Sequence, residues 1–303
     1  MMKKKHILSL IIISCLIFFI VYPLFNRKQN VITVSGGVTS ESQIVGNMIV
    51  ELINHETNLD AKLLNNLVSA QVNQVAMEKG ELNIASVRYT GTDLVTTLGL
   101  SIEKDPQKAL DIVQKEFKNR FNQTWFPSYG FANEFTFMVS KETAEKYNLK
   151  KVSDLREYAL DLTLGTDQGW YERENDGYQA FSEMYDISFK RVFPMQVGLL
   201  YDALYNNSYD VILGYSTDGR ISAYDLVLLE DDLQFFPPYT CSLVIDDKIL
   251  NEYPELEETL HRLDNKITTK TMQKLNYESD GKKLEPQIIA KQFLEENNYF
   301  REE

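Results

Sequence analysis

The sequence predicts an α/β protein made of two lobes, and three observations support this class. Short apolar runs of strand length alternate with amphipathic helical patterns along most of the chain, an arrangement typical of largely parallel sheets. The 303 residues are enough for one large or two modest domains, and 44% hydrophobic residues indicate a sizeable core. No repeat, low-complexity tract or Gly/Ser-rich linker divides the sequence. We therefore expect two lobes joined by crossing strands, with a cleft for a small ligand between them.

The first 30 residues have the pattern of a membrane segment. Residues 3–5 are lysines, and residues 7–25 are apolar and uncharged, which is close to the length that crosses the apolar core of a bilayer. Lysines on this side predict a cytoplasmic N-terminus and export of the remainder. We favour an uncleaved signal anchor over a lipoprotein signal at Cys15, because the apolar run continues well beyond that cysteine. Either device tethers the protein to the outer face of the cytoplasmic membrane.

The elements of the exported part follow from hydrophobic periodicity. Strands are predicted at residues 31–35, 82–87, 135–140, 162–166, 191–194, 209–215 and 226–229. Helices are predicted at residues 40–53, around 110–121, at 176–185 and at 197–205, and the last fifty residues read as successive helices, with Pro286 in a first helical turn. The expected domains are residues 1–30 as anchor, 31–133 as the first part of lobe 1, 134–236 as lobe 2, and 237–303 as the return to lobe 1.

Charge and residue counts argue against several classes of function. The 44 acidic and 31 basic side chains give a formal net charge of -13, which is unfavourable for binding nucleic acid. The three histidines and two cysteines are too few and too scattered for a zinc site, and no regular calcium-binding loop is present, so we expect neither metal nor cofactor. Cys241 is the one cysteine of the exported part, and its apolar surroundings predict a buried small hydrophobe.

One segment leaves an enzymatic alternative open. Residues 214–219 (Gly-Tyr-Ser-Thr-Asp-Gly) resemble a nucleophile elbow with one residue too many before the second glycine. An exported serine hydrolase using Ser216 is therefore an alternative, although it would also need a histidine partner.

Four turns are rich in aromatic residues and lie at predicted strand ends. They contain Tyr89, the dense aromatic loop at residues 125–135, Tyr215, and residues 235–239 (Phe-Phe-Pro-Pro-Tyr). A single ring at a strand end is readily explained by core packing. Four such turns together are harder to explain in that way, because strand ends also face the cleft between lobes.

These turns also carry a resemblance to a known family. The chain resembles the substrate-binding subunits of ABC importers for quaternary ammonium osmoprotectants from about residue 31 to residue 297. The matching motifs are residues 89–92 (Tyr-Thr-Gly-Thr), 172–173 with 176–178, 215–221, 229–232 with 235–239, and 274–278. The resemblance implies a periplasmic-binding-protein-like fold of type II. It also implies a binding protein that is not an enzyme, and that captures glycine betaine, carnitine or choline for osmoprotection and delivers it to an ABC permease.

The resemblance also implies which residues bind the ligand. In the family, four aromatic rings hold the trimethylammonium head, and the matching positions here are Tyr89, Phe135, Tyr215 and Tyr239. A quaternary ammonium has no N–H to donate, so the negative faces of aromatic rings recognise it instead. Phe135 stands where the family generally has tyrosine.

Two further positions are implied for the other end of the ligand, namely Thr92 and Asn133. We expect Thr92 to cap the following helix and to present its hydroxyl and free amides to a carboxylate, which favours betaines over choline. Residues 35–42 depart from the family's Gly-Ser-Lys-Asn-Phe-Thr-Glu-Gln-like loop, so no ligand contact is transferred from that loop. A tethered ligand sensor on the same fold is a further alternative.

Overall fold

The computed structural model describes residues 31–173 and 177–300. The predicted membrane segment, including Cys15, lies outside the described residues. Within the described ranges, no helix combines the length and apolarity needed to cross a bilayer.

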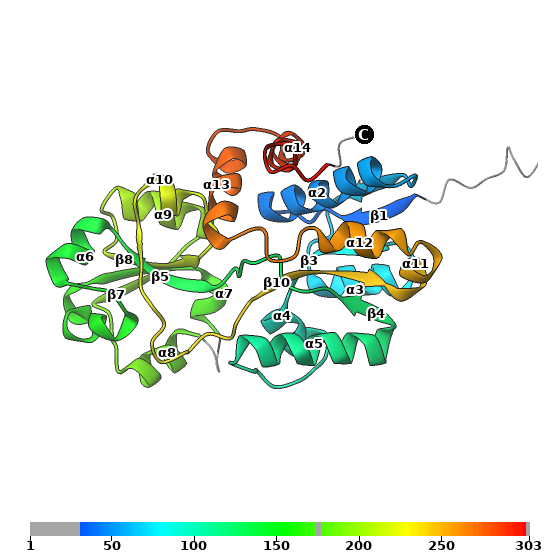
Figure 1. The fold of residues 1–303 in the computed structure, drawn as a ribbon. Helices are drawn as coiled ribbons and strands as arrows, with labels where there is room; N and C mark the ends of the chain where they lie inside the picture. Colours follow the sequence, from blue (N-terminus) through cyan, green and yellow to red (C-terminus); the bar gives the residue numbers. More distant parts are fainter. Residues whose placement is uncertain (1–30, 174–176, 301–303) are drawn as a thin grey trace, which may run out of the picture.

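The chain forms two five-stranded sheets that lie side by side (Figure 1). The order of the first sheet is β2 (Ala61–Leu64), β1 (Ile32–Ser35), β3 (Ile84–Tyr89), β10 (Cys241–Asp246) and β4 (Gln123–Trp125). The order of the second sheet is β7 (Arg191–Pro194), β6 (Thr163–Thr166), β8 (Val211–Tyr215), β5 (Phe135–Val139) and β9 (Val227–Leu228). The chain crosses from the first sheet to the second through residues 126–134, between β4 and β5, and returns through residues 229–240, between β9 and β10. These first and second crossing segments pair through an antiparallel bridge between Ala132 and Thr240.

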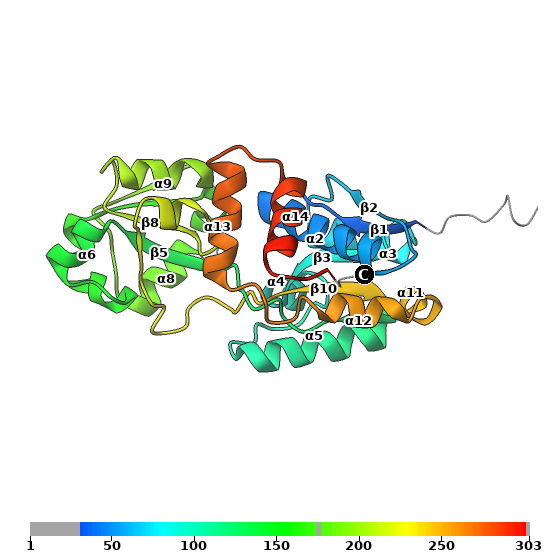
Figure 2. The ribbon, with the colours of Figure 1, turned by 45° about the horizontal axis from the view of Figure 1, so that its top comes forward.

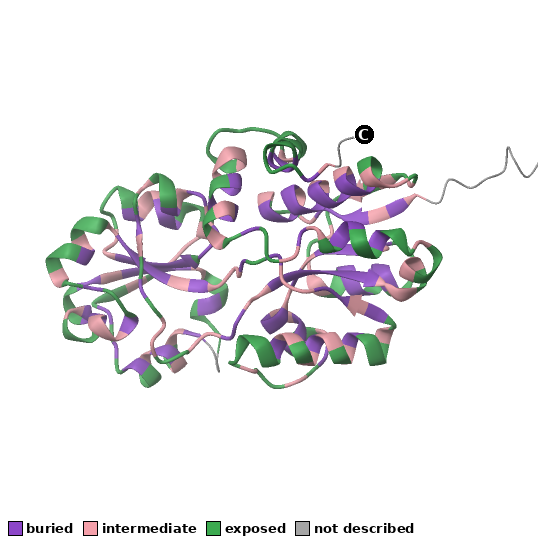
Figure 3. Ribbon diagram, viewed as in Figure 1, coloured by how far each residue is buried: buried purple, intermediate pink, exposed green. Residues whose placement is uncertain are grey.

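Helices cover both sheets and leave the central strands mostly buried, whereas the edge strands β2, β7 and β9 are intermediate or exposed (Figure 3). The first lobe contains α2 (Ser40–Glu56), α3 (Ala70–Glu78), α4 (Thr90–Thr96), α5 (Pro106–Phe121), α11 (Asp247–Glu252), α12 (Glu255–His261) and α14 (Pro286–Glu296). The second contains α6 (Lys141–Tyr147), α7 (Gln168–Tyr171), α8 (Tyr178–Tyr185), α9 (Val197–Tyr205) and α10 (Arg220–Ala223), with 3-10 turns at Val152–Glu157 and Ala159–Asp161. The remaining helix, α13 (Thr269–Asp280), stands between the lobes and contacts α2 on one side and α10 on the other (Figure 2).

Most predicted elements are confirmed. The predicted strand at residues 191–194 and the predicted helix at 197–205 coincide with β7 and α9, and Pro286 is the first residue of α14. The predicted burial of Cys241 is also confirmed, because its side chain is fully buried and its burial raises the pKa of the thiol well above the ordinary value. Three strands, β2, β4 and β10, were absent from the sequence prediction.

The prediction of largely parallel sheets was wrong for half of the strand pairings. Four pairings are parallel and four are antiparallel. All the antiparallel pairings involve β10 or β5, which are the strands that follow the two crossings. A chain entering a lobe from the cleft begins its strand at the edge where the parallel strands end, so it must run in the opposite direction.

The close packing of α13 on lobe 2 gives a first testable prediction. A Cβ atom on Gly219 would lie 2.4 Å from the backbone nitrogen of Tyr277 and 2.5 Å from its Cα, and this backbone cannot move without shifting α13. We expect Gly219→Ala to lower the free energy of unfolding by about 1–3 kcal/mol in chemical denaturation. The matched control is Gly198→Ala in α9, where nothing lies within 4 Å of the added Cβ. An equal loss in both variants would contradict this packing.

Candidate functional site

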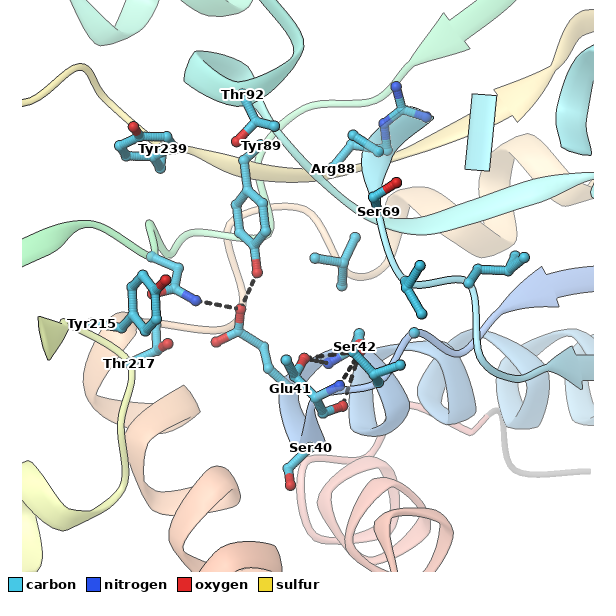
Figure 4. A pocket seen from close by; sticks show the side chains of 18 of the residues that line it. Ser40, Glu41, Ser42, Ser69, Arg88, Tyr89, Thr92, Tyr215, Thr217 and Tyr239 are labelled. Carbon is cyan, nitrogen blue, oxygen red and sulfur yellow. Dashed lines mark hydrogen bonds between the residues drawn. The ribbon is translucent and has the colours of Figure 1, made fainter. Parts of the chain in front are cut away.

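A cleft of about 550 Å³ lies between the lobes and is lined by segments from both. All six residues predicted from the sequence line it, namely Tyr89, Thr92, Asn133, Phe135, Tyr215 and Tyr239. These residues come from β3, α4, the two crossing segments, β5 and β8, so the folded chain brings together positions far apart in sequence. Figure 4 labels four of them, namely Tyr89, Thr92, Tyr215 and Tyr239.

Three of the aromatic rings form one wall. Phe135 and Tyr215 are direct partners across β5 and β8, which brings their ring centroids to 5.0 Å at an angle of 40°. The Tyr239 ring meets Phe135 edge to face at 6.3 Å and 76°. Tyr215 remains 37% exposed, so one side of this wall is open to the cleft.

The fourth ring, Tyr89, enters the cleft from the first lobe at the end of β3 (Figure 4). Its hydroxyl donates a hydrogen bond to the Glu41 carboxylate. Burial is the main reason why the pKa of Tyr89 is raised well above its ordinary value, and the nearby Glu41 charge adds to the effect. Tyr89 is therefore a neutral hydrogen-bond donor at physiological pH.

The expected helix cap at Thr92 was wrong. The N-cap of α4 is Tyr89, and Thr92 lies within the first turn of the helix. The helix begins directly after β3, which leaves no intervening residue to cap it. The amides of Thr90 and Gly91 donate to the carbonyls of Thr240 and Pro238, at 3.1 and 3.0 Å, so they do not face a ligand as free donors. Thr92 contributes its side chain to the lining of the cleft.

The close approach of α4 to the second crossing segment requires glycine at position 91. A Cβ atom there would lie 2.7 Å from the Pro238 carbonyl oxygen and 3.3 Å from the Tyr239 ring. Thr90 strengthens the same contact by donating its hydroxyl to the Pro238 carbonyl at 3.0 Å. The Thr-Gly pair therefore holds Tyr239 at a fixed place beside α4.

Asn133 connects the first crossing segment to Tyr239 in the second crossing segment and to Glu41 in α2. Its backbone amide donates to the Tyr239 carbonyl at 3.1 Å, and its side-chain Nδ2 donates to Glu41 Oε1 at 3.1 Å. Asn133 therefore helps to hold both Tyr239 and Glu41 in place beside the cleft.

Sequence reasoning missed Glu41, which is 3% exposed and lines the cleft from the first turn of α2. Its carboxylate accepts hydrogen bonds from Tyr89, Asn133 and Asn276. Burial nevertheless raises the pKa of this carboxyl above its ordinary value. A signal was present in the sequence, since glutamate occupies the seventh place of residues 35–42 as it does in the family's loop.

Ser216, the residue of the hydrolase alternative, has its hydroxyl bonded to the backbone. The side chain is 7% exposed, its Oγ donates to the Ala132 carbonyl at 3.1 Å, and it accepts from the Glu134 amide at 2.9 Å. These bonds fasten the first crossing segment to the end of β8. Within residues 31–173 and 177–300, no group of three or more His, Cys, Asp or Glu side chains is placed to hold a metal ion.

The chemistry of the cleft suits a cation that has no hydrogen to donate. Ring faces attract cations through their negative quadrupole. A cation already lies at one of these rings, because the Arg173 guanidinium carbon is 5.6 Å from the Phe135 centroid. The buried Glu41 carboxyl adds a group that is negative when ionised.

Comparison with known proteins gives consistent matches. Residues 30–296 match the family model described as the substrate binding domain of ABC-type glycine betaine transport system. The chain is 52% identical to the carnitine transport binding protein OpuCC of Listeria monocytogenes over 99% of each chain. It is 31% identical to the ergothioneine transport permease/ergothioneine binding protein EgtU of Helicobacter pylori, over 88% of this chain and 48% of that one.

Solved structures agree with these sequence matches. The crystal structure of a glycine betaine/carnitine/choline ABC transporter superposes with a TM-score of 0.87 at 49% identity, covering 89% of this chain and 100% of the other. Apo YehZ from Escherichia coli, at 22% identity, has a TM-score of 0.76 over 89% of this chain and 99% of its own, and so shares the fold.

Proposed function

The chain belongs to the family of substrate-binding domains of ABC-type glycine betaine transport systems, and from this premise we propose which ligand it takes and how. The protein captures a quaternary ammonium compatible solute (glycine betaine, carnitine or choline) outside the cytoplasmic membrane and delivers it to a cognate ABC permease. One observation carries the choice of ligand: four aromatic side chains, Tyr89, Phe135, Tyr215 and Tyr239, line a single cleft between the lobes.

The physical basis is the chemistry of the trimethylammonium head. This group has no N–H, so hydrogen bonding to a carboxylate cannot select it. Each ring face contributes about 0.5–2 kcal/mol when the pair is desolvated, and burial of the methyl groups against the rings adds an apolar contribution. A primary amine keeps its hydration more strongly and loses in comparison. The Thr92 hydroxyl and Asn133 are the proposed polar contacts for the other end of the ligand.

The same proposal includes the architecture that delivers the ligand. Residues 31–133 and 237–303 act as lobe 1, and residues 134–236 act as lobe 2. The lobes close on the ligand by a hinge motion at the two crossing segments, and the permease recognises the closed form. Residues 1–30 tether the protein as an uncleaved anchor, with a lipid on Cys15 as the alternative. The protein carries out no covalent chemistry, in keeping with the backbone bonds that occupy Ser216.

Calorimetric titration of the purified protein tests the proposal. We expect saturable binding of at least one of glycine betaine, carnitine and choline, whereas proline, which lacks a quaternary ammonium, is expected to bind more weakly than that ligand. The reason is that only a methylated head fills the space between the rings without leaving an N–H unpaired. Failure of all three quaternary ammonium compounds to bind would overturn the proposed function.

A further inference from the structure

Glu41 is a buried carboxyl group surrounded by donors from four separate parts of the chain. Tyr89 donates from the end of β3, and Asn133 Nδ2 donates from the first crossing segment at 3.1 Å. Asn276 Nδ2 donates from α13 at 3.4 Å, and the Thr217 side chain, just after β8, is a further hydrogen-bond partner. Glu41 therefore connects Tyr89, the fourth ring of the cleft, to both lobes and to the helix between them; Figure 4 shows Glu41 bonded to Tyr89.

The four partners are all neutral donors, so hydrogen bonds stabilise the Glu41 carboxylate without neutralising it. Burial of an ionised carboxylate is costly unless hydrogen bonds and an opposite charge compensate for it. The charged side chains that line the same cleft are Arg88, Arg173, Asp218 and Asp280. Arg88 is paired with Asp93, Asp218 is paired with Arg220, and Asp280 accepts from Ser40. Arg173 lies over the Phe135 ring, with its guanidinium carbon 5.6 Å from the ring centroid. A cationic ligand in the cleft would supply the positive charge that suits Glu41.

We propose that Glu41 is a positioning residue of the site, which holds the Tyr89 ring in place and provides the buried negative charge against which the ligand's cationic head is bound. This inference rests on the proposed function. A phenol that donates to a carboxylate is polarised, which makes its ring face more negative and strengthens its attraction for a cation. Glu41 thus acts on the ligand partly through Tyr89 and partly through its own charge.

The role of Glu41 predicts that binding depends on pH. Burial raises the pKa of Glu41, so the group is ionised only above a pKa that is higher than usual. A cationic ligand favours the ionised form, so binding lowers this pKa and releases a proton in the range between the two values. Affinity should therefore fall as the pH decreases through the pKa of the free protein. Tyr89 on β3 and Cys241 on β10 are titratable neighbours whose pKa values burial raises well above the ordinary ones, so both remain neutral throughout. The charged side chains on the elements around Glu41 are Arg88 on β3, Asp280 on α13 and Asp218 just after β8, and each has the partner named above.

The first experiment measures the affinity of the wild-type chain for choline and glycine betaine between about pH 4 and pH 8, where neither ligand's charge changes appreciably. Calorimetry in two buffers of different ionisation enthalpy then counts the protons released. We expect weaker binding at the acidic end and proton release on binding in the same range. An affinity that stays constant over the whole range, without proton release, would overturn the inference.

The second experiment uses Glu41→Gln, which keeps the size of the side chain and removes its charge. Loss of a charge-assisted hydrogen bond to Tyr89 should weaken binding at neutral pH by about tenfold or more and flatten the pH profile. The control is Glu51→Gln on the same helix, whose carboxylate accepts from Gln287 away from the cleft and whose removal should leave affinity unchanged. Unchanged affinity in folded Glu41→Gln would show that Glu41 is only structural.

Tyr89→Phe tests the coupling between the two residues, because it keeps the ring and removes the donor. The losses in Tyr89→Phe and Glu41→Gln should be less than additive in the double variant, since the first removes the hydrogen bond that the second weakens. Fully additive losses would contradict a role through Tyr89. If Glu41→Gln fails to fold, the wild-type pH profile still decides the matter. Absence of all quaternary ammonium binding to wild type would instead count against the proposed function itself.

Discussion

Replacement of Tyr215 with alanine is expected to lower the affinity for glycine betaine by about tenfold or more, because one ring face and its apolar contact with the methyl groups are lost. The protein should remain folded. Tyr215 is 37% exposed, and its hydrogen bonds with the Tyr201 hydroxyl use its own backbone nitrogen and carbonyl oxygen, which alanine retains. Calorimetric titration measures the affinity, and thermal unfolding checks that the variant is intact.

The matched control is Tyr205→Ala in the same lobe. Tyr205 is 57% exposed and stacks on Tyr224 at 4.3 Å, but it belongs to α9 and does not line the cleft. We expect its removal to leave glycine betaine affinity unchanged. If Tyr215→Ala bound as tightly as Tyr205→Ala, Tyr215 would have no part in the site.

Removal of the Asp93 carboxylate is expected to produce the largest loss of stability, with Asp93→Ala lowering the free energy of unfolding by about 3–5 kcal/mol. Arg88 and Asp93 form an ion pair whose two side chains are both 0% exposed, with Arg88 Nε donating to Asp93 Oδ2 at 2.9 Å. Without Asp93, the guanidinium is left buried without its counter-charge, and the Thr97 hydroxyl loses its acceptor at 2.6 Å. Urea denaturation monitored by circular dichroism measures the change.

A double variant separates the cost of the unpaired charge from the value of the ion pair. Arg88→Met combined with Asp93→Leu removes both charges and keeps apolar volume beside Phe117, over whose ring the Arg88 guanidinium lies at 5.2 Å. The double variant should be more stable than Asp93→Ala, because no charge remains buried alone. A loss below about 1 kcal/mol in Asp93→Ala would show instead that water reaches the guanidinium and that the pair is not truly desolvated.

The sequence predicted most strands and the helices α2, α5, α8 and α9 because their patterns are local, but it did not predict α3 and α6. The strand β10 was missed although its residues alternate between the two sides of the sheet, with Cys241, Leu243 and Ile245 packed in one core and Val244 in the other. Burial on both faces removes the alternation of apolar and polar residues that marks a strand. The direction of β10 and β5 was also beyond a local pattern, since it depends on the side from which the chain enters each lobe.

The site residues, like the strands and helices, were predicted only where a local sequence pattern marks them. The four rings stand in recognisable turns, so their gathering in one cleft followed from the turns and the family resemblance. Glu41 lies in the first turn of a helix, where an acidic residue is ordinarily explained by the helix dipole. Its burial depends on Asn133 and Asn276, which are distant in sequence and approach it only when the lobes and α13 are assembled. The role of Thr92 as a cap was wrong because strand and helix join without an intervening residue.

The most direct test of the central claim is a calorimetric comparison of glycine betaine with N,N-dimethylglycine and N-methylglycine. The three compounds share a carboxylate and differ in the number of methyl groups on nitrogen. If aromatic rings bind the head, affinity should fall with each methyl group replaced by hydrogen, because each replacement adds an N–H that the rings cannot satisfy and removes apolar contact. Binding of N-methylglycine as tight as that of glycine betaine would contradict recognition of a quaternary ammonium by this cleft.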